Sequence, residues 1–174
     1  MQRPIVVPLT SDVRVFQAVP KPFRRGPFQT KSGGKLFVDF VLPGPDVISR
    51  FGSWQKSELD QIPREMRGLR GYRVVDLPVG SVGGTEFHRI REEIVIGLAG
   101  ALEWTCEDFE GGQIIIQLIP GVAVWMPPFI LHTYKALEEG SGIQVLCNTL
   151  LYPDDPATSD TYSREAFLNL TKQS

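Results

Sequence analysis

The sequence predicts an all-β fold, an antiparallel β-barrel with a short C-terminal helix. Three observations support this: strand-like segments recur at near-regular spacing, glycine and proline turns separate them, and no helical pattern lies between them. The segments expected as strands are 72–77, 93–98, 101–106, 113–118, 122–126 and 143–152, with one earlier strand at 35–42. A chain of 174 residues is long enough for one domain with a substantial core.

We expect one domain, 1–174, with three parts that differ in how regular their sequence patterns are. Residues 1–68 are irregular, because prolines at 4, 8, 20, 22, 27, 43 and 45 interrupt any helix. We expect this part to wrap the barrel or to exchange with a partner subunit, with a short helical turn within 57–66. Residues 69–152 carry the barrel core. In the tail, 153–174, apolar residues at 162, 166, 167 and 170 have helical spacing.

Composition and charge exclude several classes of function. The net charge is −2 with acidic and basic residues interspersed, so neither nucleic acid nor an anionic membrane is an expected partner. The apolar runs are too short to span a bilayer, and the N-terminus has no secretory segment. Cys106 and Cys147 form no metal or redox motif and lie among apolar residues, which predicts reduced core thiols and a cytoplasmic protein.

The first of the two histidines stands beside carboxylates. Residues two apart in an extended strand share a face, so Glu86 and His88 are expected to project to the same side. A short bend follows, and Glu93 opens the next strand. There Glu93 shares a face with Val95, while Ile94 points to the other side.

The second histidine follows a turn, a strand and a break. Pro120-Gly121 forms the turn that starts the strand, and Pro127-Pro128 ends it. His132 then opens the following strand. A lone strand histidine is usually structural, but two histidines in such settings favour a site that contains both.

These two stretches resemble the two motifs of the cupin superfamily. The series Gly-x-Glu-x-His, with Glu93 after four further residues and Gly100 seven positions later, is similar to the first motif. The Pro-Gly turn, Met-Pro-Pro and His132 are similar to the second. The resemblance implies an RmlC-like jelly-roll barrel in which Glu93, rather than Glu92, faces inward.

Within the cupins, residues 60–170 resemble the sugar-nucleotide 3,4-ketoisomerases, also called WxcM-like or FdtA-like. The matching features, in order, are Ile62-Pro63, Arg70-x-Tyr72, Asp76-Leu77-Pro78, His88-Arg89, residues 124–128, His132 and the tail from Tyr152 to Phe167. The members compared isomerise a deoxythymidine-diphosphate-linked 4-keto sugar to its 3-keto isomer, and paired histidines move the proton. The resemblance implies a nucleotide-sugar isomerase of carbohydrate biosynthesis that needs no cofactor or metal and forms a homodimer.

The chain also departs from that family. Where the family has histidine, arginine, lysine and glutamine, this chain has Glu86, Gly83, Arg89 and Glu93. The isomerisation needs a base beside one carbon and a proton donor for its neighbour. We therefore expect Glu86 to serve as the base and His88 or Tyr72 to return the proton.

The predicted site has two kinds of residue. Those expected to be catalytic are Glu86, His88 and Tyr72, and those expected to contact substrate are Arg70, Arg89, Glu93 and His132. Arg70, Arg89 and Arg91 are also consistent with ordinary surface charges, and only the first two are assigned to an anionic ligand. Trp104 and Trp125 are expected in the core or an interface.

Two alternative functions remain open on the sequence. Glu86, His88, Glu93 and His132 form a two-histidine, two-carboxylate set that suits Fe, Mn, Ni or Zn. Such a metal would support oxygenase, isomerase or lyase chemistry. The other alternative is a cupin that binds a ligand without turning it over.

Overall fold

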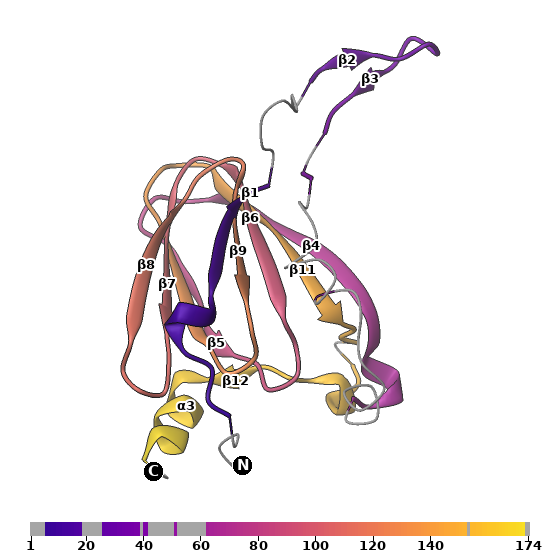
Figure 1. Ribbon diagram of the computed structural model, residues 1–174. Helices are drawn as coiled ribbons and strands as arrows, with labels where there is room; N and C mark the ends of the chain where they lie inside the picture. Colours follow the sequence, from indigo (N-terminus) through magenta and orange to yellow (C-terminus); the bar gives the residue numbers. More distant parts are fainter. Residues whose placement is uncertain are drawn as a thin grey trace.

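Two antiparallel sheets packed face to face form the body of the molecule (Figure 1). The structure, a computed structural model, describes residues 6–18, 26–38, 40–41, 51, 62–152 and 154–172. The prediction of an all-β jelly-roll barrel with one short C-terminal helix is confirmed. Within these ranges, no helix is long and apolar enough to cross a membrane.

Each sheet has five strands. The first sheet has the order β1 (Arg14–Gln17), β9 (Val122–Met126), β6 (Glu93–Ala99), β11 (Ser141–Thr149) and β4 (Arg67–Leu77). The second has the order β12 (Tyr162–Ser163), β5 (Val82–Phe87), β10 (Leu131–Ala136), β7 (Leu102–Glu107) and β8 (Gln113–Leu118). Neighbours in sequence often lie in opposite sheets, so residues from distant segments meet between the sheets.

The side chains of β6 alternate between the two faces of its sheet, as expected from the sequence, and those on the inner face join the core. Val95 of β6 packs inside, against Leu102 and Trp104 of the second sheet. Ile94 lies on the outer face of the first sheet, where it packs in a second apolar cluster with Trp125. Both faces of β6 are therefore buried, which explains its nearly continuous apolar sequence.

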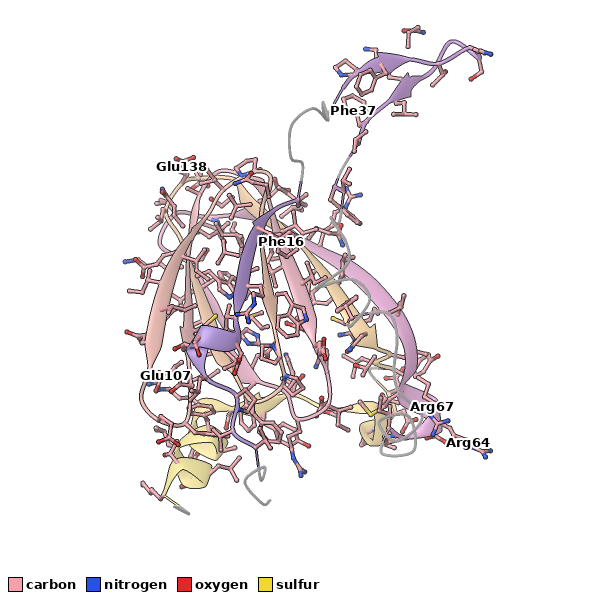
Figure 2. All side chains as sticks on the ribbon, in the orientation of Figure 1. Phe16, Phe37, Arg64, Arg67, Glu107 and Glu138 are labelled. Atoms are coloured by element: carbon pink, nitrogen blue, oxygen red, sulfur yellow. The ribbon has the colours of Figure 1, made fainter. Side chains whose placement is uncertain are left out.

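The expected strand at 35–42 is much shorter in the structure. Only Lys35–Leu36 forms a strand, β3, and it pairs with β2 (Phe28–Gln29) in a two-stranded hairpin. The hairpin projects away from the barrel, and Phe37 beyond it is exposed (Figure 2). Among the described residues, no third strand pairs with this hairpin, so nothing there extends its pairing. Residues 39 and 42 lie outside the described residues.

The remaining boundaries differ in smaller ways. β4 begins at Arg67 rather than 72, and β11 ends at Thr149 rather than 152. Two short 3-10 turns lie in the N-terminal part, η1 (Thr10–Asp12) and η2 (Arg64–Met66). The second falls at the end of the helical turn expected within 57–66, of which 57–61 lie outside the described residues.

The tail closes one end of the barrel. It contains the 3-10 turn η3 (Pro156–Thr158), then β12, then the predicted helix α3 (Arg164–Thr171). Ser163 caps the helix, its side chain accepting from the backbone N–H of Ala166. Phe167 is fully buried, with its ring 4.5 Å from that of Phe109 and 5.5 Å from that of Phe87. This packing holds β12 and the residues before it against the end of β5.

Candidate functional site

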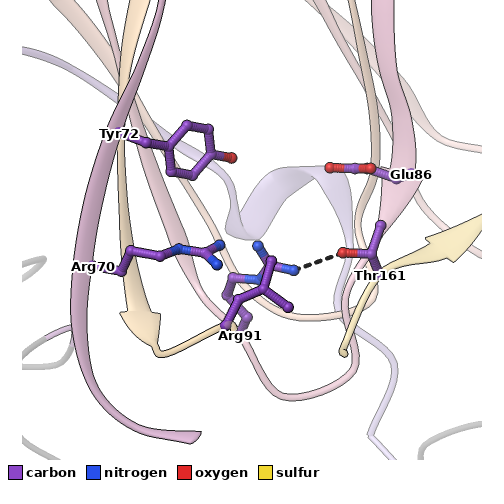
Figure 3. Close-up of a pocket in the computed structure, with 6 residues that line it drawn as sticks. Arg70, Tyr72, Glu86, Arg91 and Thr161 are labelled. Atoms are coloured by element: carbon purple, nitrogen blue, oxygen red, sulfur yellow. Dashed lines mark hydrogen bonds between the residues drawn. The ribbon is translucent and has the colours of Figure 1, made fainter. Parts of the chain in front are cut away.

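Two cavities that share lining residues lie between the sheets. The inner cavity has a volume of about 210 Å³ and is lined mainly by Tyr72, Glu86, Glu93, Trp104, His132 and Tyr134. The outer cavity, of about 440 Å³, is lined by Arg70, Tyr72, Glu86, Arg91, Leu151 and Thr161 (Figure 3). Tyr72 and Glu86 line both, so they mark the junction. The outer volume lies within the range of roughly 300–1,000 Å³ that is typical of small-molecule sites.

The strand register brings the predicted site residues together. Glu86 of β5 pairs directly with His132 of β10. His88 follows the end of β5, and its Nε2 lies 4.0 Å from Oε1 of Glu86. The expectation that Glu86 and His88 share a side therefore holds, although β5 ends at Phe87.

The carboxylate of Glu93 lies at the centre of a buried charge network. Its Oε1 is 3.4 Å from Nε2 of His88 and 3.2 Å from a guanidinium nitrogen of Arg91, and its Oε2 is 3.6 Å from Nε2 of His132. Burial alone would raise the pKa of Glu93, but the hydrogen bond with His88, the electrostatic interactions with both histidines and the charge of Arg91 outweigh it. The pKa of Glu93 therefore lies well below its usual range, and the group is a carboxylate.

The neighbouring Glu92 confirms the choice between the two glutamates. Its side chain lies on the opposite face, where Oε2 accepts a hydrogen bond of 2.9 Å from Nε1 of Trp125. Trp125 is itself buried, as expected. Glu93 therefore faces inward and Glu92 supports the outer apolar cluster.

Backbone carbonyls fix the orientation of both imidazole rings. Nδ1 of His88 lies 2.8 Å from the carbonyl oxygen of Asp160, and Nδ1 of His132 lies 3.2 Å from that of Ile130. A carbonyl only accepts, so each Nδ1 carries a hydrogen, and Nε2 of each ring faces the carboxylate of Glu93. Burial lowers the pKa of His132 to about 4, which keeps that ring neutral. Nε2 of His88 faces two carboxylates and is suited to hold a proton or a cation between them.

Two arginines enter the outer cavity. Their guanidinium groups point toward each other below Tyr72 (Figure 3). Arg70 donates to the sulfur of Cys147 at 3.5 Å, and Arg91 donates to Oγ1 of Thr161 at 2.8 Å. Two converging guanidinium groups are the usual protein partners of a phosphate or carboxylate.

The pair of arginines that enters the site differs in one member from the pair that was assigned to it from the sequence. Arg91, considered only as a surface charge, is 4% exposed and contacts Glu93. The sequence gives no strict signal for this place, because residues 88–92 lie between β5 and β6, outside the regular strands. Arg89 is exposed, lies over the ring of Tyr162 at 6.0 Å, and is not among the residues that line these two cavities.

Tyr72 and Trp104 form walls of the site. Burial, with the nearby charge of Glu93, raises the pKa of Tyr72 far above its ordinary value, so this phenol keeps its proton. Trp104 is buried as expected, and its indole stacks on the ring of His132 with centroids 5.6 Å apart. That stacking, which strand parity alone does not indicate, makes Trp104 a part of the inner cavity.

The thiols have the predicted character. Cys106 and Cys147 are free and buried, and burial raises their pKa values to about 12 and about 11. Cys147 lies at the edge of the site, where its sulfur is 3.3 Å from Oε1 of Glu93. Neither thiol is poised to act as a thiolate.

The same residues fit a divalent metal ion. One ligand atom each from Glu86, His88 and His132 lies within 4.8 Å of the others. Both imidazoles offer the Nε2 lone pair, and carbonyl groups orient both rings from behind, an arrangement common around metal ions. Two nitrogens and one carboxylate oxygen suit Zn, Fe, Mn or Ni.

Comparisons with known proteins give structural relatives but no sequence relatives. No protein-family model and no curated protein matches the sequence. QdtA, a sugar 3,4-ketoisomerase from Thermoanaerobacterium thermosaccharolyticum solved with TDP, superposes with a TM-score of 0.57 at 17% identity, over 95% of this chain and 98% of its own. A 3,4-ketoisomerase from Helicobacter canadensis has a TM-score of 0.56 at 15% identity, over 92% and 98%.

The fold is that of the RmlC-like cupins. A third such structure, WlaRA, a TDP-fucose-3,4-ketoisomerase from Campylobacter jejuni, has a TM-score of 0.55 at 17% identity, over 92% of this chain and 96% of its own. The fold expected from the two cupin-like motifs is therefore confirmed. In this chain, the residues of both motifs meet at one buried site.

Proposed function

We propose that this cupin is an isomerase that moves a proton between adjacent carbons of a nucleotide-linked 4-keto sugar. One observation carries the proposal: Oε1 of Glu86, a residue that lines both cavities, lies 4.0 Å from Nε2 of His88. The two groups could therefore reach neighbouring atoms of one sugar ring. The structural neighbours, one of them solved with TDP-4-keto-6-deoxyglucose, support this class of substrate.

The reaction needs one base and one acid. The Glu86 carboxylate takes the proton from the carbon beside the carbonyl, and the bonding electrons form an enediolate. The proton then passes from Glu86 to the Nε2 lone pair of His88, and His88 gives it to the former carbonyl carbon. The proton of the neighbouring hydroxyl moves to the former carbonyl oxygen, so the ketone and the hydroxyl exchange places. Tyr72 keeps its proton and donates a hydrogen bond to the enediolate oxygen.

The outer cavity suits the diphosphate. Arg70 and Arg91 both line it, and a guanidinium group binds phosphate oxygens through paired N–H donors. These cations also offset the repulsion that the Glu86 carboxylate would exert on a diphosphate. We therefore assign the sugar to the inner cavity and the diphosphate to the outer one.

A metal-dependent cupin is the second candidate. The convergence of Glu86, His88 and His132 on one point favours it. A bound divalent ion would supply Lewis-acid polarisation of a carbonyl or an open position for oxygen chemistry. In that case Glu86 holds the ion and does not act as a base.

Replacing Glu86 by glutamine separates these functions. If Glu86 is the base, Glu86→Gln lowers kcat by about 100-fold to 10,000-fold, since general-base catalysis contributes that much. The Kd for TDP, measured by calorimetry, stays within about twofold because the arginines remain. Glu103→Gln, the same substitution on β7 outside the lining of both cavities, is the matched control.

Three outcomes would contradict this assignment of function and of the base. Wild-type turnover in Glu86→Gln excludes Glu86 as the base. A stoichiometric metal ion that is present in the wild-type protein and lost in Glu86→Gln supports the metal-dependent cupin. Tight TDP binding by a wild-type protein that never converts the keto sugar supports a ligand-binding cupin.

A further inference from the structure

The turn between β5 and β6 is held by a residue from the C-terminal tail. Three consecutive backbone N–H groups, those of Arg89, Ile90 and Arg91, donate to the carboxylate of Asp160 at 3.1, 2.9 and 2.8 Å. Asp160 is 2% exposed. A buried carboxylate is costly unless it is well bonded, and three backbone donors meet that requirement.

The backbone of the same residue holds the catalytic ring. The carbonyl oxygen of Asp160 lies 2.8 Å from Nδ1 of His88. The next residue, Thr161, accepts a hydrogen bond of 2.8 Å from Arg91 in the outer cavity (Figure 3). Asp160 and Thr161 thus contact the ring, the turn that follows it and the buried arginine.

We infer that Asp160 is a positioning residue that sets the tautomer and orientation of His88. Its carboxylate anchors the tail to the 89–91 turn, and this anchor places its carbonyl oxygen behind Nδ1. His132 has no such dependence, because its Nδ1 faces the carbonyl of Ile130, two residues away in its own loop. The tail therefore controls one of the two imidazoles and not the other.

The inference has a chemical consequence that rests on the proposed function. With Nδ1 bonded to Asp160, Nε2 of His88 faces Glu86 and Glu93 as a proton carrier. Without the anchor, the neutral ring is free to place its hydrogen on Nε2, and Nδ1 loses its acceptor. Proton transfer would then slow while TDP binding, carried by the arginines, would change less.

Nitrogen–proton NMR of the imidazole rings tests the inference without using activity. The chain has two histidines, so the spectrum contains two rings. In wild type both are expected as the Nδ1–H tautomer. In Asp160→Ala the His88 ring shifts to a mixture of tautomers while the His132 ring stays unchanged, and the amides of residues 90 and 91 exchange about tenfold faster or more.

The controls separate positioning from folding. Asp155→Ala also removes a tail carboxylate that accepts from a backbone N–H, that of Ala157, but outside the site, and it should leave both rings unchanged. If Asp160→Ala does not fold, Asp160→Asn decides, since it exchanges one acceptor oxygen for a donor at constant volume. A folded variant of either kind that keeps the wild-type His88 tautomer would overturn the inference. A wild-type protein without isomerase activity would leave the tautomer result intact and would count against the proposed function alone.

Discussion

Arg91 shows how a single buried cation supports a buried carboxylate. It contacts Glu93 at 3.2 Å, and both side chains are almost fully buried. Removing one partner of a buried ion pair leaves the other charge without compensation, which costs more than the pair itself contributes. The two histidines near Glu93 provide part of the remaining compensation.

We therefore predict that Arg91→Met lowers the free energy of unfolding by about 3 kcal/mol. Urea denaturation measures the change. Arg89→Met is the matched control, since Arg89 is exposed and should lose at most about 0.5 kcal/mol. Equal losses in the two variants would contradict the assignment of Arg91 to the buried network.

The buried histidine and glutamate make the fold sensitive to acid. The pKa of His132 is about 4 in the folded protein and 6.5 in its ordinary state, so below pH 6.5 the unfolded chain binds a proton that the folded protein does not. The pKa of Glu93 is also lowered, from 4.5. Below pH 4.5 the unfolded chain therefore binds a proton that the folded protein does not, and this further lowers the free energy of unfolding. At neutral pH neither group lowers the free energy of unfolding, and that free energy decreases as the pH falls.

The unfolding free energy should therefore fall between pH 6.5 and pH 4, with His132 contributing a slope of up to about 1.4 kcal/mol per pH unit. Urea denaturation with a chelator present measures the profile. In His132→Gln the slope between pH 6.5 and 4.5 should decrease, because that titrating group is gone. A His132→Gln profile parallel to the wild-type one would rule out this origin.

At the scale of elements, the spacing of turn residues predicted the barrel strands well and the ends of the chain poorly. The segments at 93–98, 113–118 and 122–126 match β6, β8 and β9 because glycine and proline turns bound these short apolar runs. The segment at 35–42 has similar composition, yet of its described residues, 35–38 and 40–41, only two lie in a strand. The residue types of a segment indicate whether it favours an extended conformation. The length of the strand depends on whether a neighbouring strand pairs with it.

The same reasoning explains which site residues the sequence could indicate. Glu86, His88, Glu93 and His132 lie on or beside regular strands, so parity and motif spacing brought them together. Asp160 comes from a tail that no periodicity connects to β5, and its role depends on a tertiary contact. Arg89 and Arg91 lie in a turn, where strand parity does not apply strictly and backbone bonds to the tail decide which side chain enters the site.

The helix α3 is the element that fixes the tail. Phe167 is fully buried among Phe87 and Phe109, whereas its neighbour Leu168 is 40% exposed. Phe167→Ala should cost about 3 to 5 kcal/mol because it leaves a cavity in this cluster, and Leu168→Ala should cost about 1 kcal/mol or less. Thermal unfolding measures both. A Phe167→Ala protein as stable as Leu168→Ala would show that the tail does not depend on this packing.

At the scale of the whole molecule, the sandwich places a hydrophilic site inside an apolar barrel. The two sheets supply opposite walls, with Tyr72 on β4 facing Glu86 on β5 (Figure 3). The tail closes one end and contributes Asp160 and Thr161. The homodimer implied by the family resemblance remains a prediction, which light scattering would test.

Hydrogen exchange at the sugar carbon tests the proposed proton transfer most directly. The wild-type protein is incubated in heavy water with the proposed substrate, a nucleotide-linked 4-keto sugar, and NMR follows the sugar ring. The account predicts a 3-keto product that carries solvent deuterium on the former carbonyl carbon, with the reaction abolished in Glu86→Gln. A wild-type protein that forms no such product and exchanges no carbon-bound hydrogen, or a Glu86→Gln variant that does both at the wild-type rate, would contradict it.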